Sequence, residues 1–218
     1  IAFMILFTLL MAFIFIKRPH LSRQSIPYAI FATGLAGMIF NLGLIFTFQI
    51  FYGYLYHQIG LLIATFMFGV ALSSFFITQR LDRIKRDSLL FLKIEMGIIL
   101  FSFLFPFVFS QYLETPAVSL LIYPVFLIMS LLSGASIGLQ FPLATKIYLG
   151  TPTKGGTFGH TAGLLYGADL LGGFLGGLFG GILLLPILGL KESCFMMAMV
   201  KISSGILFLL FIRTHKVN

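Results

Sequence analysis

The chain has 218 residues, of which 59% are hydrophobic and 9% are charged, and its formal net charge is +8. Because soluble domains typically contain about 25% charged residues, this composition excludes an ordinary water-soluble globular protein. The Lys and Arg residues lie in short segments between apolar runs and form no soluble basic face, which argues against nucleic-acid binding. The single cysteine, Cys194, excludes an intrachain disulfide and makes no metal cluster by itself. The composition therefore predicts an integral membrane protein whose main partner is the lipid bilayer.

The sequence predicts an all-α fold, a polytopic transmembrane bundle of about seven helices. A helix needs roughly 20 apolar residues to cross a hydrocarbon core about 30 Å thick. The predicted helices cover, in chain order, residues 1–16, 28–51, 55–78, 88–110, 116–147, 161–190 and 193–212. We therefore expect residues 1–218 to form a single transmembrane domain.

The first predicted helix differs from the others because the chain begins inside it, with Ile1 rather than Met. Basic residues follow this helix and no small-residue cleavage site is evident, which favours a truncated membrane helix over a signal peptide. We expect an upstream part of the protein to precede it. Residues 1–27 are assigned to an extra helix with its inner loop, and residues 28–218 to a six-helix unit.

The basic residues predict how the helices are oriented. Alternate connections between the predicted helices receive Lys17, Arg18, Arg23, Arg80, Arg83, Lys85, Arg86, Lys146, Lys154, Arg213 and Lys216. The opposite connections hold Lys191 next to Glu192, and Glu114. Since cytoplasmic loops retain positive charge, the basic side is predicted to be cytoplasmic. We expect a multi-pass protein of the bacterial inner (cytoplasmic) membrane with a cytoplasmic C-terminus.

Charged residues inside the predicted spans are functional candidates, because lipid excludes a charge that is neither paired nor hydrated. Asp169, Glu95 and Lys201 lie roughly 13, 11 and 16 Å from the inner ends of their helices, at about 1.5 Å per residue. We predict that Lys201 pairs with Asp169, with Glu95 as the competing partner. Two roles stay open: a lock between the sixth and seventh helices, or a substrate or proton pathway. Lys93 lies nearer the inner surface and is expected to extend its amine toward water.

Uncharged polar residues also occur within the predicted spans. Asn41 and Gln49 lie in the second predicted helix, and Gln140 lies in the fifth. Their side chains can form hydrogen bonds between helices, so we interpret them as contacts that hold helices together.

A polar patch is predicted at the outer mouth, where Tyr54, His57 and Gln58 follow one another closely. An interfacial belt of amphipathic side chains is the simpler interpretation of the same residues. The histidines do not place two imidazoles opposite each other at membrane depth, so we expect no haem. We predict no catalytic residues, metal site or cofactor, because no Ser-His-Asp spacing, zinc motif or Walker sequence is present.

Glycines repeat at four-residue spacing in the sixth predicted helix and form two adjacent stripes. They are Gly172, Gly173, Gly176, Gly177, Gly180 and Gly181. Small residues let the backbones of membrane helices approach closely, so helix packing is favoured over a ligand passage.

Several stretches resemble one known family when they are considered together and in order. They are GMIFNL at residues 37–42, YGYLYHQIGLLIA at 52–64, FMFGVALS at 66–73, GLQFPLA at 138–144, LYGADLLG at 165–172 and LPILGL at 185–190. These stretches are similar to the membrane region of bacterial spermidine-synthase-like proteins, in which a major-facilitator-like membrane part is fused to a soluble aminopropyltransferase domain.

The resemblance implies that residues 28–218 form one six-helix facilitator half. Two departures from the family limit it. Asn41 stands where the family is expected to carry a glutamate, and the synthase domain with its Gly-rich nucleotide loop is absent from these residues. Polyamine synthesis is therefore not assigned to this chain.

Three functional hypotheses follow. The first is a non-catalytic membrane domain or subunit that anchors or scaffolds a partner enzyme or a larger membrane complex. The second is half of a transporter for a small cationic solute, with a cavity lined by Asp169, Glu95 and Gln49 and completed by a protein partner or a missing upstream half. The third is an enzyme whose active site needs an upstream domain.

Overall fold

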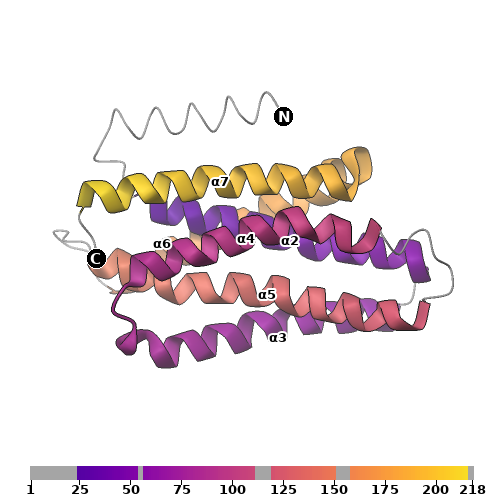
Figure 1. The fold of residues 1–218 in the computed structure, drawn as a ribbon, viewed down its shortest axis with the longest axis horizontal. Helices are drawn as coiled ribbons and strands as arrows, with labels where there is room; N and C mark the ends of the chain where they lie inside the picture. Colours follow the sequence, from indigo (N-terminus) through magenta and orange to yellow (C-terminus); the bar gives the residue numbers. More distant parts are fainter. Residues whose placement is uncertain (1–23, 54–55, 111–118, 151–157, 216–218) are drawn as a thin grey trace.

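A computed structural model describes residues 24–53, 56–110, 119–150 and 158–215 (Figure 1). All regular structure in these residues is helical, which confirms the all-α part of the predicted fold class. The elements are α2 (Ser25–Tyr52), α3 (Tyr56–Arg80), η2 (Leu81–Arg83), α4 (Asp87–Ser110), α5 (Ser119–Gly150), α6 (Phe158–Phe179), η4 (Gly180–Leu188) and α7 (Gly189–His215). The extra helix predicted at residues 1–16 lies outside the described residues. Of the inner loop predicted to follow it, only residues 24–27 are described, and α2 begins there.

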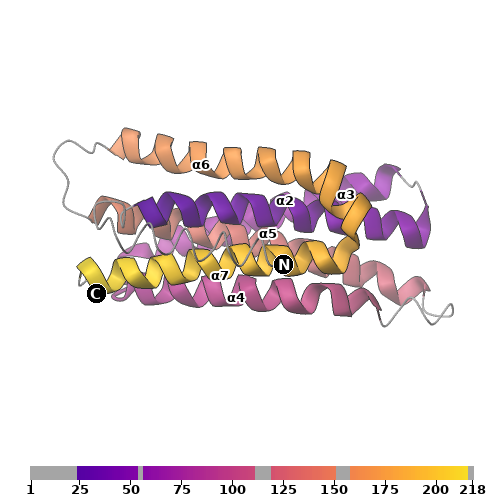
Figure 2. The ribbon, with the colours of Figure 1, turned by 90° about the horizontal axis from the view of Figure 1, so that it is seen from above.

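Five helical stretches in the described residues are long and apolar enough to cross a membrane, so the prediction of about seven separate helices is wrong for this part of the chain. One reason is that the predicted helix of residues 1–16 lies outside it. The other is that the last two predicted helices form one stretch of 56 residues, Phe158–Arg213. The π-helical segment η4 joins α6 to α7 without a loop, although the two helices then run in opposite directions (Figure 2). The chain is a multi-pass helical membrane protein.

Glycines with positive φ end two of the helical segments. Gly53 follows α2 with φ 75°, and its N–H donates to the carbonyl oxygen of Gln49 at 2.9 Å. Gly189 follows η4 with φ 84°, and its N–H donates to the carbonyl oxygen of Leu185. Left-handed backbone costs glycine little, so the chain changes direction at both positions while the last carbonyls remain hydrogen-bonded.

The helices pack in a repeated pattern. Helix α2 packs along α6, α3 packs along α5, and α4 packs against α7. If α2 is exchanged with α5, α3 with α6 and α4 with α7, the same three pairs result. Helix α2 also contacts α7 and lies between α6 and α7 (Figure 2). This arrangement determines which polar side chains can meet inside the bundle.

Two apolar clusters fill the interior, one toward each end of the bundle. The first includes Ala36, Phe40, Phe48, Ile98, Phe105, Phe126 and Met197. The second includes Ile26, Ile30, Phe91, Leu143, Ile147, Phe208 and Phe211. On α2, α4, α5 and α7 alike, the residues of one cluster are separated along the helix from those of the other. Polar residues occupy the space between them.

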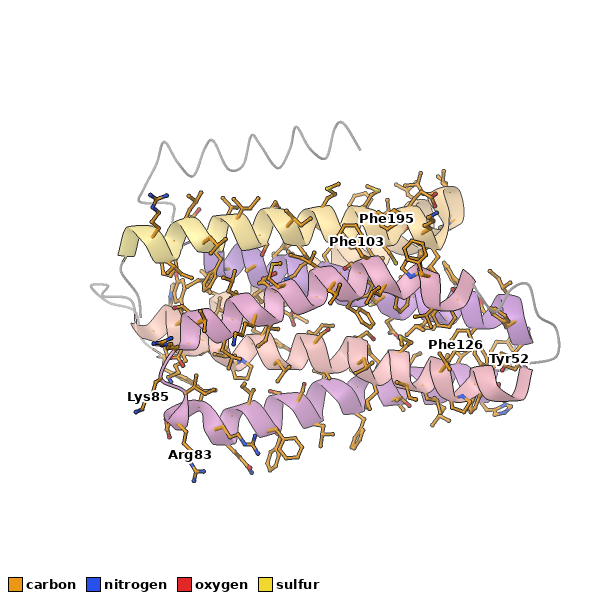
Figure 3. All side chains as sticks on the ribbon, viewed as in Figure 1. Tyr52, Arg83, Lys85, Phe103, Phe126 and Phe195 are labelled. Atoms are coloured by element: carbon orange, nitrogen blue, oxygen red, sulfur yellow. The ribbon has the colours of Figure 1, made fainter. Side chains whose placement is uncertain are left out.

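The outer surface is strongly apolar. Phe68 and Phe75 on α3, Leu100 on α4 and Phe174 on α6 are between 59% and 62% exposed. Side chains of this size favour contact with lipid tails over contact with water. Arg83 and Lys85 lie at one end of the bundle, and Tyr52 lies at the opposite end (Figure 3).

Candidate functional site

A buried ion pair connects α4 to α7. The Nζ atom of Lys201 lies 2.7 Å from Oε2 of Glu95, and neither side chain has exposed surface. Both residues come from apolar helices, so their charges are held away from water. A pair of this kind persists at such depth only if its remaining donors and acceptors are also satisfied.

The lysine ammonium has three oxygen neighbours. Besides Glu95, Lys201 Nζ donates to the hydroxyl oxygen of Thr33 at 2.9 Å and to Oε1 of Gln140 at 3.4 Å. The Thr33 hydroxyl is itself within hydrogen-bond distance of Gln140 Oε1. An ammonium has three donors, and oxygen atoms on three different helices lie within reach of them, two as hydrogen-bond acceptors and Glu95 Oε2 as the ion-pair partner.

The second carboxylate oxygen of Glu95 is also bound. The hydroxyl of Ser204 donates to Glu95 Oε1 at 3.0 Å. We refer to Thr33, Glu95, Gln140, Lys201 and Ser204 as the polar layer. It lies between the two apolar clusters and joins α2, α4, α5 and α7.

The prediction that Lys201 pairs with Asp169 is wrong, and the competing partner, Glu95, forms the pair. The depths of the three residues were compatible with either pairing, but the lateral arrangement of the helices is not. Asp169 lies on α6, and α2 separates α6 from α7 (Figure 2). Helix α4 instead packs directly against α7 and presents Glu95 to Lys201.

Asp169 lies at the contact between α6 and α2 and is half-buried. A Cβ atom added at Gly34 would lie 2.7 Å from Asp169 Oδ1, so the carboxylate is close to the backbone of α2. Within the described residues it forms no ion pair. Of the three charged residues predicted at membrane depth, Glu95 and Lys201 therefore form a buried ion pair, and Asp169 has no charged partner in the described chain.

The predicted uncharged polar residues have different environments. Only Gln140 joins the polar layer, and its Nε2 atom has no hydrogen-bond partner in the described part of the chain. Asn41 is buried, and its Oδ1 likewise lacks a partner there. Gln49 is half-buried near the end of α2. The interpretation of these residues as hydrogen bonds between helices is thus supported for Gln140.

One of the two glycine stripes makes the close contact with α2. A Cβ at Gly172 would overlap the carbonyl oxygen of Phe31, and one at Gly176 would lie 2.6 Å from the carbonyl oxygen of Leu35. Added at Gly180, it would lie 2.8 Å from a side-chain carbon of Ile39. The other stripe is looser: a Cβ at Gly173 would meet nothing within 4 Å. At Gly177 and Gly181 it would make ordinary van der Waals contact.

The predicted outer-mouth patch is described in part. His57 is exposed and Gln58 is half-buried at the start of α3, while Tyr54 lies outside the described residues. The Oε1 atom of Gln58 has no hydrogen-bond partner among the residues described. Nothing in this geometry brings the two side chains to the polar layer.

The described residues contain no group of three or more His, Cys, Asp or Glu side chains that could hold a metal ion.

Comparison of the chain with protein-family models, with curated proteins and with solved structures gives no match.

The geometry thus provides a compact charged network inside the bundle rather than an open reaction centre. Two members of the polar layer, Thr33 and Ser204, were not predicted. Threonine and serine often bond to the carbonyl four residues earlier in their own helix, so a hydroxyl in an apolar run is a weak signal. The spacing of three residues between Lys201 and Ser204, which places both on one helix face, was the signal available.

Proposed function

We propose that this chain is a non-catalytic integral membrane domain or subunit that anchors or scaffolds a partner enzyme or a larger membrane complex. One observation carries the proposal: the membrane-depth charges of Glu95 and Lys201 are completely buried and bonded within the bundle. Charges that bind only one another and neighbouring helices stabilise a shape. They are not positioned to bind a solute.

The cavities of the described bundle support this proposal. Three of them have volumes of about 570, 220 and 450 Å³. Glu95, Lys201 and Gln140 are not among their lining residues. A transport pathway requires that water or solute reach the charged groups, which these three cavities do not provide.

We assign the exposed face of helix α6 to the partner. It exposes large apolar side chains, including Leu170 and Phe174. Asp169 precedes Leu170 in sequence, is half-buried against α2 and forms no ion pair in the described residues. Because lipid disfavours such a carboxylate, a polar group from another chain would stabilise it. The resemblance to spermidine-synthase-like membrane regions is consistent with this role, since that family joins its membrane part to an enzyme.

Copurification tests the scaffold. A tagged full chain is extracted in mild detergent, and the molar ratio of copurifying proteins is measured. We expect one partner in a fixed ratio. We also expect a photocrosslinking residue at Leu170 on α6 to capture it, whereas one at Met67 on α3, equally exposed to the surroundings, does not. Isolation of the chain as a monomer that has an activity of its own without a partner would refute the proposal. Equal capture from both positions would also refute it.

The orientation in the bacterial inner membrane is part of the proposal. The basic residues favour a cytoplasmic location for the end of the bundle that carries Arg83 and for the C-terminus. In a Cys194→Ala background, Arg83→Cys should resist a membrane-impermeant maleimide in intact cells, whereas Tyr56→Cys should react. Labelling of Arg83→Cys from outside would invert the arrangement.

A second candidate function is half of a small-solute transporter of the polyamine type. The repeated helix pairing favours it, because transporters commonly place substrate sites between structural repeats. Asp169 is the residue best placed to bind a cationic solute, because it is half-buried and has no charged partner in the described chain. Asp169→Asn should then abolish spermidine uptake while the protein still inserts and folds. Unchanged uptake would exclude this function.

A further inference from the structure

A groove of about 570 Å³ lies between the start of α4 and the end of α7. This is the end of the bundle where Lys85 is seen (Figure 3). Lys85, Arg86 and Ser88 supply its polar lining, and its apolar lining comes from Leu89, Leu92, Leu209 and Ile212. The groove thus combines cationic groups with a wall of leucine and isoleucine side chains.

The positive charge of the groove is not neutralised by the described residues around it. Lys85 and Arg86 are exposed and form no ion pair within the described chain. The adjacent acid, Asp87, is bound to Lys146 at 2.9 Å. Lys146 Nζ also donates to the carbonyl oxygens of Leu81 at 2.6 Å and Ile84 at 3.3 Å. These contacts engage the acid next to Arg86 in sequence and fix the connection that carries the two cations. The other acid of this connection, Asp82, is exposed and forms no ion pair with Lys85 or Arg86 in the described chain.

Ser88 provides a second, independent indication of a ligand. It lines the groove, is 2% exposed, and its hydroxyl has no hydrogen-bond partner in the described part of the chain. Buried hydroxyls are normally hydrogen-bonded. It also lies in the first turn of α4, where backbone N–H groups lack partners within the helix and favour an anion. An acceptor carrying negative charge would satisfy both features.

We propose that this groove binds one anionic phospholipid. The phosphate of the headgroup contacts Lys85 and Arg86 and accepts a hydrogen bond from Ser88, and an acyl chain lies against Leu89, Leu92 and Leu209. A free phosphate would leave the apolar wall uncovered, and a zwitterionic lipid would leave the two cations without a net counter-charge. The proposal does not depend on whether the chain acts as a scaffold or as a transporter half.

Lipid binding by the full chain in detergent micelles tests the charge contribution. Titration with phosphatidylglycerol or phosphatidylcholine is followed by native mass spectrometry. We expect phosphatidylglycerol to bind at least about tenfold more tightly, and Lys85→Gln/Arg86→Gln to remove most of this preference. The matched control is Arg80→Gln/Arg83→Gln, which removes two cations from the same connection but none from the groove lining. Equal losses in the two variants, or no preference in the unmodified chain, would overturn the proposal.

Two further measurements identify the contact and its source. Ser88→Ala should weaken phosphatidylglycerol binding by about tenfold, since it removes a hydrogen bond to a charged group. Unchanged binding would overturn the role assigned to Ser88. Inorganic phosphate at millimolar concentration should not displace the bound lipid. Displacement at concentrations similar to those of the lipid would show that the groove recognises phosphate alone and would overturn the assignment of a phospholipid.

Discussion

Two contacts in this bundle hold helices together by different means. Between α4 and α7, Glu95 and Lys201 form an ion pair that is completely buried and bonded to further polar groups. Between α6 and α2, Gly172 and Gly176 bring the backbones into direct contact, and the nearby acid Asp169 has no ion pair in the described chain. The first contact depends on complementary charge and the second on the absence of side chains.

The difference shows what replaces the hydrophobic effect within a bilayer. Apolar side chains gain little by leaving lipid for a protein interior, so association requires close packing or hydrogen bonds between helices. The α4 and α7 contact specifies a partner, because only a matching carboxylate compensates Lys201. The α6 and α2 contact specifies a distance. Substitutions that remove one property at a time can distinguish these two mechanisms.

The largest expected effect is that of Lys201→Met. It leaves the Glu95 carboxylate buried without its counter-charge, so we expect the free energy of unfolding to fall by about 3–5 kcal/mol. Unfolding in mixed micelles with increasing dodecyl sulfate measures the change. Lys93→Met is the control, because Lys93 is exposed on the same helix as Glu95 and should change stability by less than about 0.5 kcal/mol. Similar losses in both variants would contradict a special role for the pair.

A smaller loss is expected from Gly172→Ala. The added methyl group overlaps the carbonyl oxygen of Phe31, so α6 must move away from α2 at a cost of about 3 kcal/mol. Its neighbour provides the control. Gly173→Ala meets nothing within 4 Å and should be neutral or stabilising, since alanine favours helix more than glycine does. Thermal unfolding in detergent compares the two variants, and equal destabilisation would exclude the close contact assigned to Gly172.

Ser204→Ala removes one hydrogen bond from the polar layer and leaves the ion pair in place. We expect a loss of about 1.5 kcal/mol, the lower value for a hydrogen bond to a charged group, because Glu95 still binds Lys201. Ser102→Ala is the matched control: Ser102 is equally buried, but its hydroxyl bonds to the carbonyl oxygen of Ile98 in its own helix. If both variants lose the same stability, the bond between α7 and α4 contributes nothing specific.

The smallest effect on stability is expected from Asp169→Asn. Because Asp169 has no ion pair in the described chain, its neutralisation should lower the free energy of unfolding by no more than about 0.5 kcal/mol. Glu95→Gln provides the contrast, since it leaves Lys201 buried without compensation and should cost about 3–5 kcal/mol. The same dodecyl sulfate titration measures both. A large loss in Asp169→Asn would place this acid in the stabilising network.

The sequence was sufficient to identify the members of the ion pair but not to pair them correctly. Charge in a long apolar run is a strong signal, which is why Glu95 and Lys201 stood out. Depth along a helix axis was estimated from the residue count. The rotation of each helix and its lateral neighbours were not, and these features excluded Asp169 as the partner.

The glycine repeat gave a similar partial result. Its four-residue period predicted close packing of the sixth predicted helix, and the structure shows that contact at Gly172 and Gly176. The period did not indicate which of two adjacent stripes would face α2, because both have the same spacing. The number of helical stretches was misjudged because η4 joins the sixth and seventh predicted helices into one stretch.

The order of synthesis gives the polar layer a consequence for assembly. Ser204 follows Glu95 by 109 residues, and Lys201 precedes Ser204 by less than one turn of the same helix. At about 5–20 residues per second, the ribosome completes α4 on the order of 5–20 s before either ligand of its carboxylate exists. During this interval Glu95 lacks its counter-charge, so it must remain in contact with water or with the insertion machinery. The newly made protein can therefore leave the insertion machinery only after α7, which carries Lys201 and Ser204, has been synthesised.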